Sequence, residues 1–116
     1  MAEKYALFAF NGELMCFAHV LLNTLDLADK GYEVKLIIEG SATGLISDFE
    51  KEETPFRGLY LKCIERGLLD CVCRACAAKM GSLDAAEQNK LPLCGDMSGH
   101  PGIARYIENG YRIITF

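Results

Sequence analysis

The sequence has no excess of basic residues, which argues against nucleic acid as its main partner. Its 116 residues include 12 lysines and arginines against 16 aspartates and glutamates, which gives a net charge of −4. Phosphate binding needs a basic footprint. The basic residues are also scattered along the chain and are not interleaved with aromatic side chains. We therefore expect no nucleic-acid partner.

Long hydrophobic runs are missing as well. No apolar run approaches the roughly 20 residues that span a bilayer, and the stretch 4–10 is too short for the apolar core of a signal peptide with its flanks. The sequence therefore predicts a cytoplasmic protein with no membrane partner. Its six cysteines should be mostly reduced there. Reduced cysteines indicate thiol chemistry, metal ligation or packing before structural disulfides.

The apolar pattern predicts five strands that alternate with helices in one domain, 1–116. Strands are expected at 4–10, 32–38, 68–72, 91–93 and 111–116. Helices are expected at 13–30, 44–49, 54–66, 74–80, 83–89 and 101–109, with Thr54, Ser82 and Pro101 at the starts of the third, fifth and sixth. Strands joined by helices are usually parallel. The predicted fold class is α/β, a three-layer α/β/α sandwich with a five-stranded, mainly parallel sheet.

The loops that follow the strands carry the candidate site. In a parallel sheet these loops all leave at one edge, and open α/β sheets bind ligands there. Segments far apart in the sequence should therefore converge. The candidate residues at this edge are Asn11, Gly12, Gly40, Cys73, Arg74, Cys76, Cys94, Gly95 and His100.

Cys73 is the best placed of these residues, because it stands at or beside the N-cap of the expected helix 74–80. Free backbone N–H groups and the helix dipole favour an anion at that position. We expect them to lower the pKa of the Cys73 thiol, with Arg74 adding positive charge. Cys76 lies one turn further on and would reach Cys73. Cys71, two residues earlier in the strand, should point to the same face of the sheet as Cys73.

Several interpretations of the cysteines remain open. Cysteine is often a small buried hydrophobe, and this interpretation suits Cys16 and Cys63 on the predicted helices. Cys73 and Cys76, with Cys94 or His100 from the next loop, would instead form a thiolate-rich metal or small-ligand site. The C-x-x-C spacing also fits a dithiol redox pair, although the sequence has no tryptophan, a residue that usually accompanies such a motif.

The loop 95–100 also has two interpretations. His100, or Ser98 before it, would cap the last helix. Alternatively, the glycine-containing loop 95–100 brings its backbone N–H groups and an imidazole to a ligand beside Cys73.

Three segments resemble the DsrE/DsrF-like family of small α/β proteins, which includes sulfur-relay subunits. They are the end of the first strand, Phe8–Asn11, the stretch Cys73–Gly81 and the closing Gly110–Phe116. The resemblance covers nearly the whole chain. It places Cys73 at the position of the sulfur-carrying cysteine of the relay subunits, and Cys76 at the second cysteine of a C-x-x-C found in some members.

The resemblance implies a cysteine that accepts sulfur as a persulfide, in a homo- or hetero-oligomer that is commonly trimeric or hexameric. The expected function is sulfur handling between donor and acceptor proteins, with no cofactor, by a carrier more than a turnover enzyme. The relay carriers typically rely on one cysteine at this place, whereas this chain has others nearby. A neighbouring thiol such as Cys76 would attack the persulfide, release sulfide and leave a disulfide. This difference favours a reductive release step or a redox role.

Overall fold

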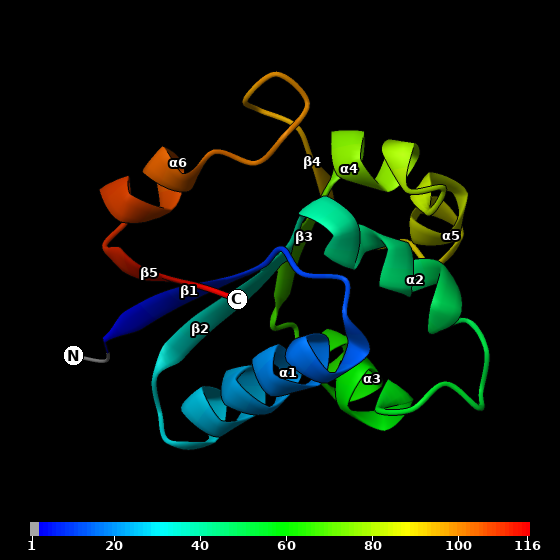
Figure 1. Ribbon diagram of the computed structural model, residues 1–116. Helices are drawn as coiled ribbons and strands as arrows, with labels where there is room; N and C mark the ends of the chain where they lie inside the picture. Colours follow the sequence, from blue (N-terminus) through cyan, green and yellow to red (C-terminus); the bar gives the residue numbers. More distant parts are fainter. Residues whose placement is uncertain (1–2) are drawn as a thin grey trace.

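The computed structural model describes residues 3–116 and contains a five-stranded sheet in which all strands are parallel (Figure 1). The strands lie in the order β4-β3-β2-β1-β5. Their bounds are β1 Lys4–Ala9, β2 Glu33–Ile38, β3 Leu69–Cys73, β4 Leu93–Cys94 and β5 Tyr111–Thr115. The α/β fold class and the parallel sheet predicted from the sequence are confirmed.

Six α-helices and one 3-10 helix connect these strands within the described residues. The long helix α1, Leu14–Asp29, joins β1 to β2. The other helices are shorter: η1 Gly40–Gly44, α2 Leu45–Asp48, α3 Arg57–Glu65, α4 Arg74–Lys79, α5 Leu83–Gln88 and α6 Ile103–Glu108. None of them is long and apolar enough to cross a membrane.

The order of the strands decides which face of the sheet each helix covers. The chain steps from β1 to β2, β3 and β4 in one direction, then returns to the far side of β1 for β5. Crossovers between parallel strands are almost always right-handed. A step in the opposite direction therefore carries its helix to the opposite face, and α6 alone makes such a step. Figure 1 shows α6 on the other side of the sheet from α1 and α3.

The two faces have separate cores, and alternating residues of β2 belong to one or the other. Leu36 and Ile38 pack with Phe17 and Leu21 of α1. Ile37, between them, packs with Tyr106 of α6 on the other face. This alternation is the period of two that a strand imposes on its side chains. Because α6 is the one helix of residues 3–116 on the second face, the sheet is less completely covered there.

Two helix starts differ from the prediction. Phe56, with a left-handed φ of 69°, precedes α3, and the Thr54 hydroxyl donates to the Asp48 carbonyl at 2.5 Å instead of capping the helix. Ser82 is the N-cap residue of α5, as predicted, but its side chain does not cap the helix, since its hydroxyl bonds that of Ser47 at 2.9 Å.

The last helix begins later than predicted, at Ile103, with Gly102 as its N-cap residue. Pro101 therefore lies outside the helix, and the prediction that His100 or Ser98 caps it is wrong. The fourth strand is also displaced, from 91–93 to Leu93–Cys94. Here the pairing of Cys73 with Cys94 across β3 and β4 fixes the register.

Leu21→Ala tests the first core. The Leu21 side chain is fully buried, at 0% exposure, so its truncation should cost about 2–5 kcal/mol of unfolding free energy. Leu22→Ala on the same helix is the control, because Leu22 is 47% exposed and should lose less than about 1 kcal/mol. Urea unfolding followed by circular dichroism measures both. Equal losses would contradict the described packing of α1.

Candidate functional site

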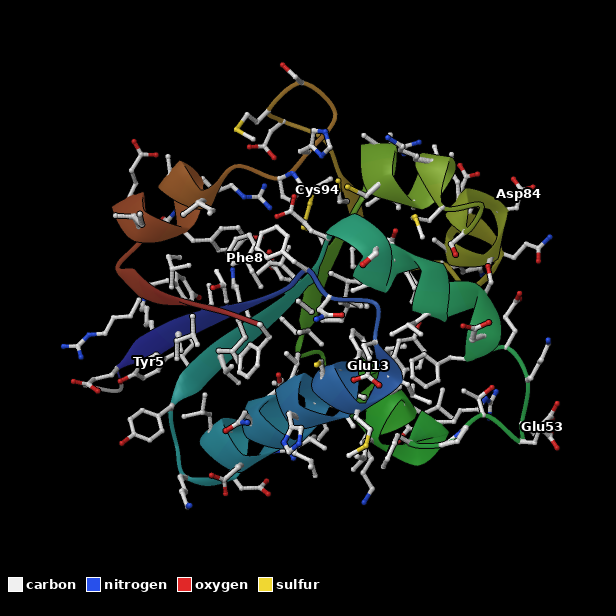
Figure 2. The ribbon with its side chains drawn as sticks, viewed as in Figure 1. Tyr5, Phe8, Glu13, Glu53, Asp84 and Cys94 are labelled. Carbon is white, nitrogen blue, oxygen red and sulfur yellow. A yellow bond between two sulfur atoms is a disulfide. The ribbon has the colours of Figure 1, made fainter. Side chains whose placement is uncertain are left out.

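The ends of β3 and β4 bring the candidate cysteines together at one edge of the sheet. Cys73 is the last residue of β3 and the N-cap residue of α4. Its neighbour across the ladder is Cys94, the last residue of β4. Figure 2 shows the sulfur atoms near Cys94 beside the loop that follows β4. The convergence expected from a parallel sheet is therefore present for these residues.

Cys73, Cys76 and His100 form the centre of the site. His100 Nδ1 lies 3.1 Å from Cys73 Sγ and 3.5 Å from Cys76 Sγ. The backbone N–H of Cys76 donates to Cys73 Sγ at 3.4 Å. We call these three residues the Cys–His–Cys cluster. With the imidazole proton on Nε2, Nδ1 is an acceptor that can take a proton from either thiol.

A tight loop holds His100 against the two thiols. Met97 and His100 exchange backbone hydrogen bonds of 2.7 and 2.9 Å. The Gly99 carbonyl accepts the N–H of Ala75 at 3.0 Å, which attaches the loop to the first turn of α4. Gly99 has a φ of +92°, and a Cβ there would lie 3.1 Å from the Ala75 side chain. Glycine is required at this position both by the backbone conformation and by the close approach.

The protonation of Cys73 differs from the prediction. Burial raises the pKa of the Cys73 thiol to about 12, and the N–H of Cys76 opposes this only in part. The nearby Cys76 thiol and Glu39 carboxylate raise the pKa further. The expectation of a lowered pKa is therefore wrong, because the cost of removing a thiolate from water outweighs the hydrogen bond and the dipole of a short helix. At neutral pH Cys73 is a thiol.

Cys71 and Cys94 form a disulfide, so the expectation of reduced cysteines is wrong for this pair. The free cysteines are Cys16, Cys63, Cys73 and Cys76. The register that places Cys94 beside Cys73 also brings it within reach of Cys71, two residues earlier on the same face of β3. The metal site predicted from Cys73 and Cys76 with Cys94 or His100 therefore cannot use Cys94 as a ligand.

The remaining predicted residues take different places. The Gly12 N–H donates to Ser41 Oγ at 2.8 Å, outside the Cys–His–Cys cluster, and Asn11 and Gly12 line a separate hollow with Ser41 and Met80. Gly40, with a φ of +56°, lies against the carbonyl of Phe10. These contacts join the loop that follows β1 to the segment that follows β2.

Arg74 and Gly95 flank the cluster without touching its sulfur atoms in the described structure. Arg74 is exposed, and its guanidinium forms no hydrogen bond or ion pair with any of residues 3–116. The causes that shift the pKa of Cys73 are burial, Cys76 and Glu39, and the predicted effect of Arg74 is not among them. Gly95 accepts the Gly99 N–H at 3.2 Å and so closes the loop that carries His100.

Sequence reasoning missed Glu39, a buried carboxyl group at the end of β2. Burial raises the pKa of the Glu39 carboxyl group, and the charge of His100 opposes that shift. Glu39 immediately precedes Gly40 at the predicted edge, but in the sequence it is one of 16 acidic residues. Only its burial distinguishes it.

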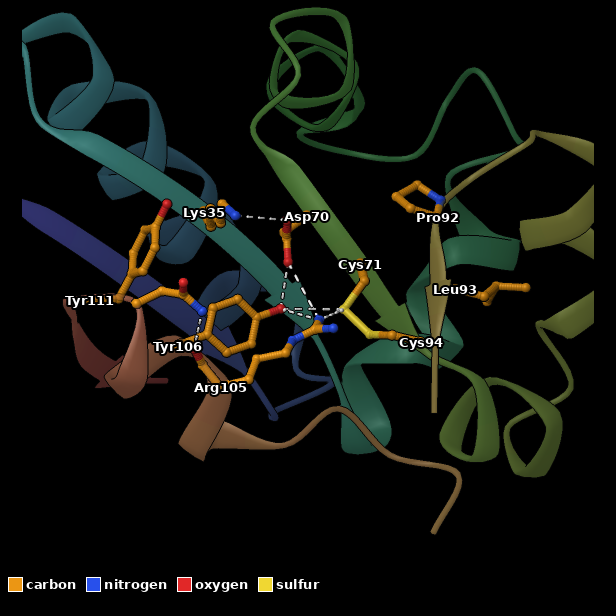
Figure 3. A pocket seen from close by; sticks show the side chains of 10 residues that line it. Lys35, Asp70, Cys71, Pro92, Leu93, Cys94, Arg105, Tyr106 and Tyr111 are labelled. Carbon is orange, nitrogen blue, oxygen red and sulfur yellow. Dashed lines mark hydrogen bonds and ion pairs between the residues drawn. A yellow bond between two sulfur atoms is a disulfide. The ribbon is translucent and has the colours of Figure 1, made fainter. Parts of the chain in front are cut away.

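A second group of polar residues was also missed, and Figure 3 shows it around the Cys71–Cys94 disulfide. It lies on the face of the sheet that carries α6. Its charged members are Lys35, Asp70 and Arg105, which come from β2, β3 and α6. No periodic pattern or motif in the sequence connects these three residues.

Fold and site together define a class: an α/β protein with a parallel sheet and a Cys–His–Cys cluster at the carboxyl edge of its strands. No family model matches the chain. The chain belongs to the family of the uncharacterized protein MJ0733 of Methanocaldococcus jannaschii, to which it is 36% identical over 96 residues, 83% of this chain and 76% of that protein.

Two further relatives are uncharacterized proteins of Archaeoglobus fulgidus. Each is 54% identical to this chain, one over 43 residues (37% of this chain and 70% of the relative) and one over 37 residues (32% and 100%). Among solved structures, the conserved protein of unknown function BT1422 from Bacteroides thetaiotaomicron has a TM-score of 0.74 and 16% identity. That match covers 98% of this chain and 95% of that chain, and it shows the fold alone.

The raised pKa of Cys73 predicts how its reactivity depends on pH. In the native protein, alkylation of Cys73 by iodoacetamide should keep accelerating above pH 10, because the thiolate forms only as the pH approaches about 12. In the urea-unfolded chain the same thiol should titrate near the ordinary value of about 8.5. Mass spectrometry of the tryptic peptide 67–74, without reduction, follows Cys73 because Cys71 is blocked by its disulfide.

The same shift has a consequence for stability. The folded state keeps the proton of Cys73 while the unfolded state loses it, so this contribution is fully present below about pH 8.5. It is lost as the pH rises from there toward about 12. A native alkylation rate that levels off below pH 8 would contradict both the raised pKa and this pH dependence.

Proposed function

We propose that this protein handles sulfane sulfur, which it carries as a persulfide on Cys73. The observation that supports the proposal best is the position of His100 Nδ1, 3.1 Å from Cys73 Sγ. A buried thiol with a raised pKa is a poor nucleophile. An imidazole within hydrogen-bond distance can take its proton at the moment of attack, as a general base does for other weak nucleophiles.

The loading step transfers one sulfur atom from a donor persulfide. His100 Nδ1 takes the proton of Cys73, and the thiolate attacks the outer sulfur of the donor. The donor's S–S bond breaks as the new bond to Cys73 forms. The donor leaves as a thiolate and takes the proton back from His100, so that a thiol and a persulfide have exchanged one sulfur atom with no net oxidation.

Cys76 gives the site a route for release. Its sulfur also lies beside His100, at 3.5 Å from Nδ1, and its backbone N–H contacts Cys73 Sγ. Attack of the Cys76 thiolate on Cys73 Sγ expels hydrosulfide and forms a Cys73–Cys76 disulfide. Two thiols from outside must then reduce that disulfide. The cluster therefore suits reductive release or dithiol redox chemistry as well as transfer to an acceptor protein.

The resemblance to the DsrE/DsrF-like family extends the proposal beyond the site. We propose a cytoplasmic location from the apolar pattern of the sequence. The resemblance implies a three-layer α/β/α sandwich, donor and acceptor proteins as partners, and a trimeric or hexameric homo-oligomer. The parallel sheet with helices on its two faces supports the first of these. The others rest on the resemblance alone.

Sulfur loading of cysteine variants tests the proposal. After incubation with a cysteine desulfurase and cysteine, intact mass spectrometry without reductant should show a reducible gain of one sulfur atom on wild type and none on Cys73→Ser. Cys16→Ser is the control, because Cys16 is a partly exposed free thiol on α1 outside the cluster. Cys76→Ser should retain the sulfur longer, since its resolving thiol is gone. A Cys73→Ser protein that loads as well as wild type would refute the assignment.

A matched pair of histidine variants tests the proposed base. His100→Gln should slow loading on the order of 10²-fold, the size of a general-base contribution. His19→Gln should load at the wild-type rate, because His19 is the other of the two histidines and is exposed on α1. Equal rates for the two variants would remove His100 from the chemistry and leave Cys73 to act alone.

The Cys–His–Cys cluster also favours a second candidate function, metal binding. The ligand atoms of Cys73, Cys76 and His100 all lie within 4.8 Å of one another. Two cysteines and one histidine, with a fourth position left for water or substrate, are one of the ligand sets of catalytic zinc. A bound cation would also compensate the thiolate charge that burial disfavours.

Zinc titration separates this candidate from the persulfide carrier. One Zn²⁺ per chain should bind more tightly at pH 8.5 than at pH 7, because the cation must displace the proton of Cys73. His100→Ala should weaken binding by about tenfold or more, whereas His19→Ala should not. Competition with a chromophoric chelator measures these affinities. Absence of binding, or equal loss in the two histidine variants, would leave the thiol chemistry as the function.

A further inference from the structure

The Cys71–Cys94 disulfide faces a pocket that the proposed function does not use. The pocket has a volume of about 360 Å³ and lies over β2, β3 and β4, on the face of the sheet that α6 covers only in part (Figure 3). The lining includes Asp70, Cys71, Cys94, Arg105 and Tyr106. Its size and position allow a small molecule to reach the disulfide.

The two sulfur atoms of this disulfide have different surroundings. Cys71 is 3% exposed, whereas Cys94 is half-buried at the end of the edge strand β4. A thiolate from solvent therefore reaches Cys94 more easily. The partner that departs in such an attack is Cys71, and its surroundings decide how readily it leaves.

One donor points at Cys71 Sγ: an N–H of the Arg105 guanidinium donates to it at 3.6 Å. The Tyr106 hydroxyl lies 3.5 Å from the same sulfur, but its proton goes to Asp70. In a disulfide the contact with Arg105 is weak, because the sulfur carries no charge. A Cys71 thiolate at the same place would gain a charge-assisted hydrogen bond from the guanidinium.

The guanidinium is held in place by neighbours on both sides. It donates to the Tyr106 hydroxyl at 2.8 Å and lies 3.7 Å from Asp70 and 3.9 Å from Asp96. Tyr106 in turn donates to Asp70 at 2.5 Å. Because these contacts come from β3, α6 and the loop before α6, Arg105 is already oriented before Cys71 acquires a charge.

We propose that the Cys71–Cys94 disulfide is a second redox site, opened by low-molecular-weight thiols that enter this pocket. The thiolate attacks Cys94 Sγ, a bond forms between the two sulfurs, and the Cys71–Cys94 bond breaks. Cys71 leaves as a thiolate beside Arg105. A second thiolate then attacks the sulfur of the first thiol in the mixed disulfide and releases Cys94 as a thiolate. In total the protein gains two electrons, and two small thiols become one small disulfide.

This second site is independent of the proposed sulfur carrier. It uses Cys71, Cys94 and Arg105, and none of these is a member of the Cys–His–Cys cluster. It can therefore be tested in a Cys73→Ser/Cys76→Ser variant, in which persulfide loading is abolished. Failure of either proposal leaves the other standing.

The experiment measures how fast 2-mercaptoethanol opens the disulfide of that double variant. Samples are quenched with acid and alkylated, and the modified cysteines are located by fragmentation of tryptic peptides. At limiting thiol the first mixed disulfide should appear on Cys94. Arg105→Gln should slow opening by about tenfold, because the leaving thiolate loses its cation. Arg105→Lys should restore part of the rate.

Arg66→Gln is the matched control. Arg66 has the same charge and nearly the same side-chain exposure as Arg105, 42% against 41%, but it pairs with Asp29 away from the pocket. It should open at the rate of the parent double variant. Urea unfolding of each variant confirms that the comparison is made on folded protein. A first mixed disulfide on Cys71, or equal rates for the Arg105→Gln and Arg66→Gln variants, would overturn the proposal.

Discussion

The parallel direction of all five strands is the constraint on which the rest of the structure depends. It sends every strand-to-helix loop to one edge, so that the end of β3 meets the loop that follows β4. The right-handed rule then places α6 alone on the second face, because only the last crossover runs in the opposite direction. The first consequence assembles Cys73, Cys76 and His100. The second leaves the disulfide of Cys71 open to a pocket.

The two sulfur sites differ in how they handle negative charge. At the cluster, burial keeps Cys73 protonated, and reactivity depends on an imidazole that can remove the proton. At the disulfide, a guanidinium already faces the sulfur that would become charged. The Cys–His–Cys cluster therefore forms its thiolate nucleophile only when His100 takes the proton. The Cys71–Cys94 site instead stabilises its leaving thiolate. Both sites follow from three cysteines placed on two adjacent strand ends, with Cys76 one turn beyond.

Much of the fold could be predicted from the sequence, because strands and helices leave local signals. The apolar run at 4–10 and the spacing of Leu14, Phe17 and Leu21 identify β1 and α1 without tertiary information. Parallel strands then bring Cys73 and His100 to one edge. Three features had no local signal. The pKa of Cys73 depends on burial by other segments, the partner of Cys71 depends on the register of a two-residue strand, and Arg105 becomes relevant only through the side on which α6 packs.

The chain separates a thiol pair from a disulfide within one cysteine-rich edge. The most direct test is a disulfide map of the native protein, denatured in excess iodoacetamide without reductant and digested with trypsin. Peptides 67–74 and 91–105 should be joined through Cys71 and Cys94, with Cys73 and Cys76 both alkylated. A Cys73–Cys76 or Cys73–Cys94 linkage in place of that pattern would contradict this separation.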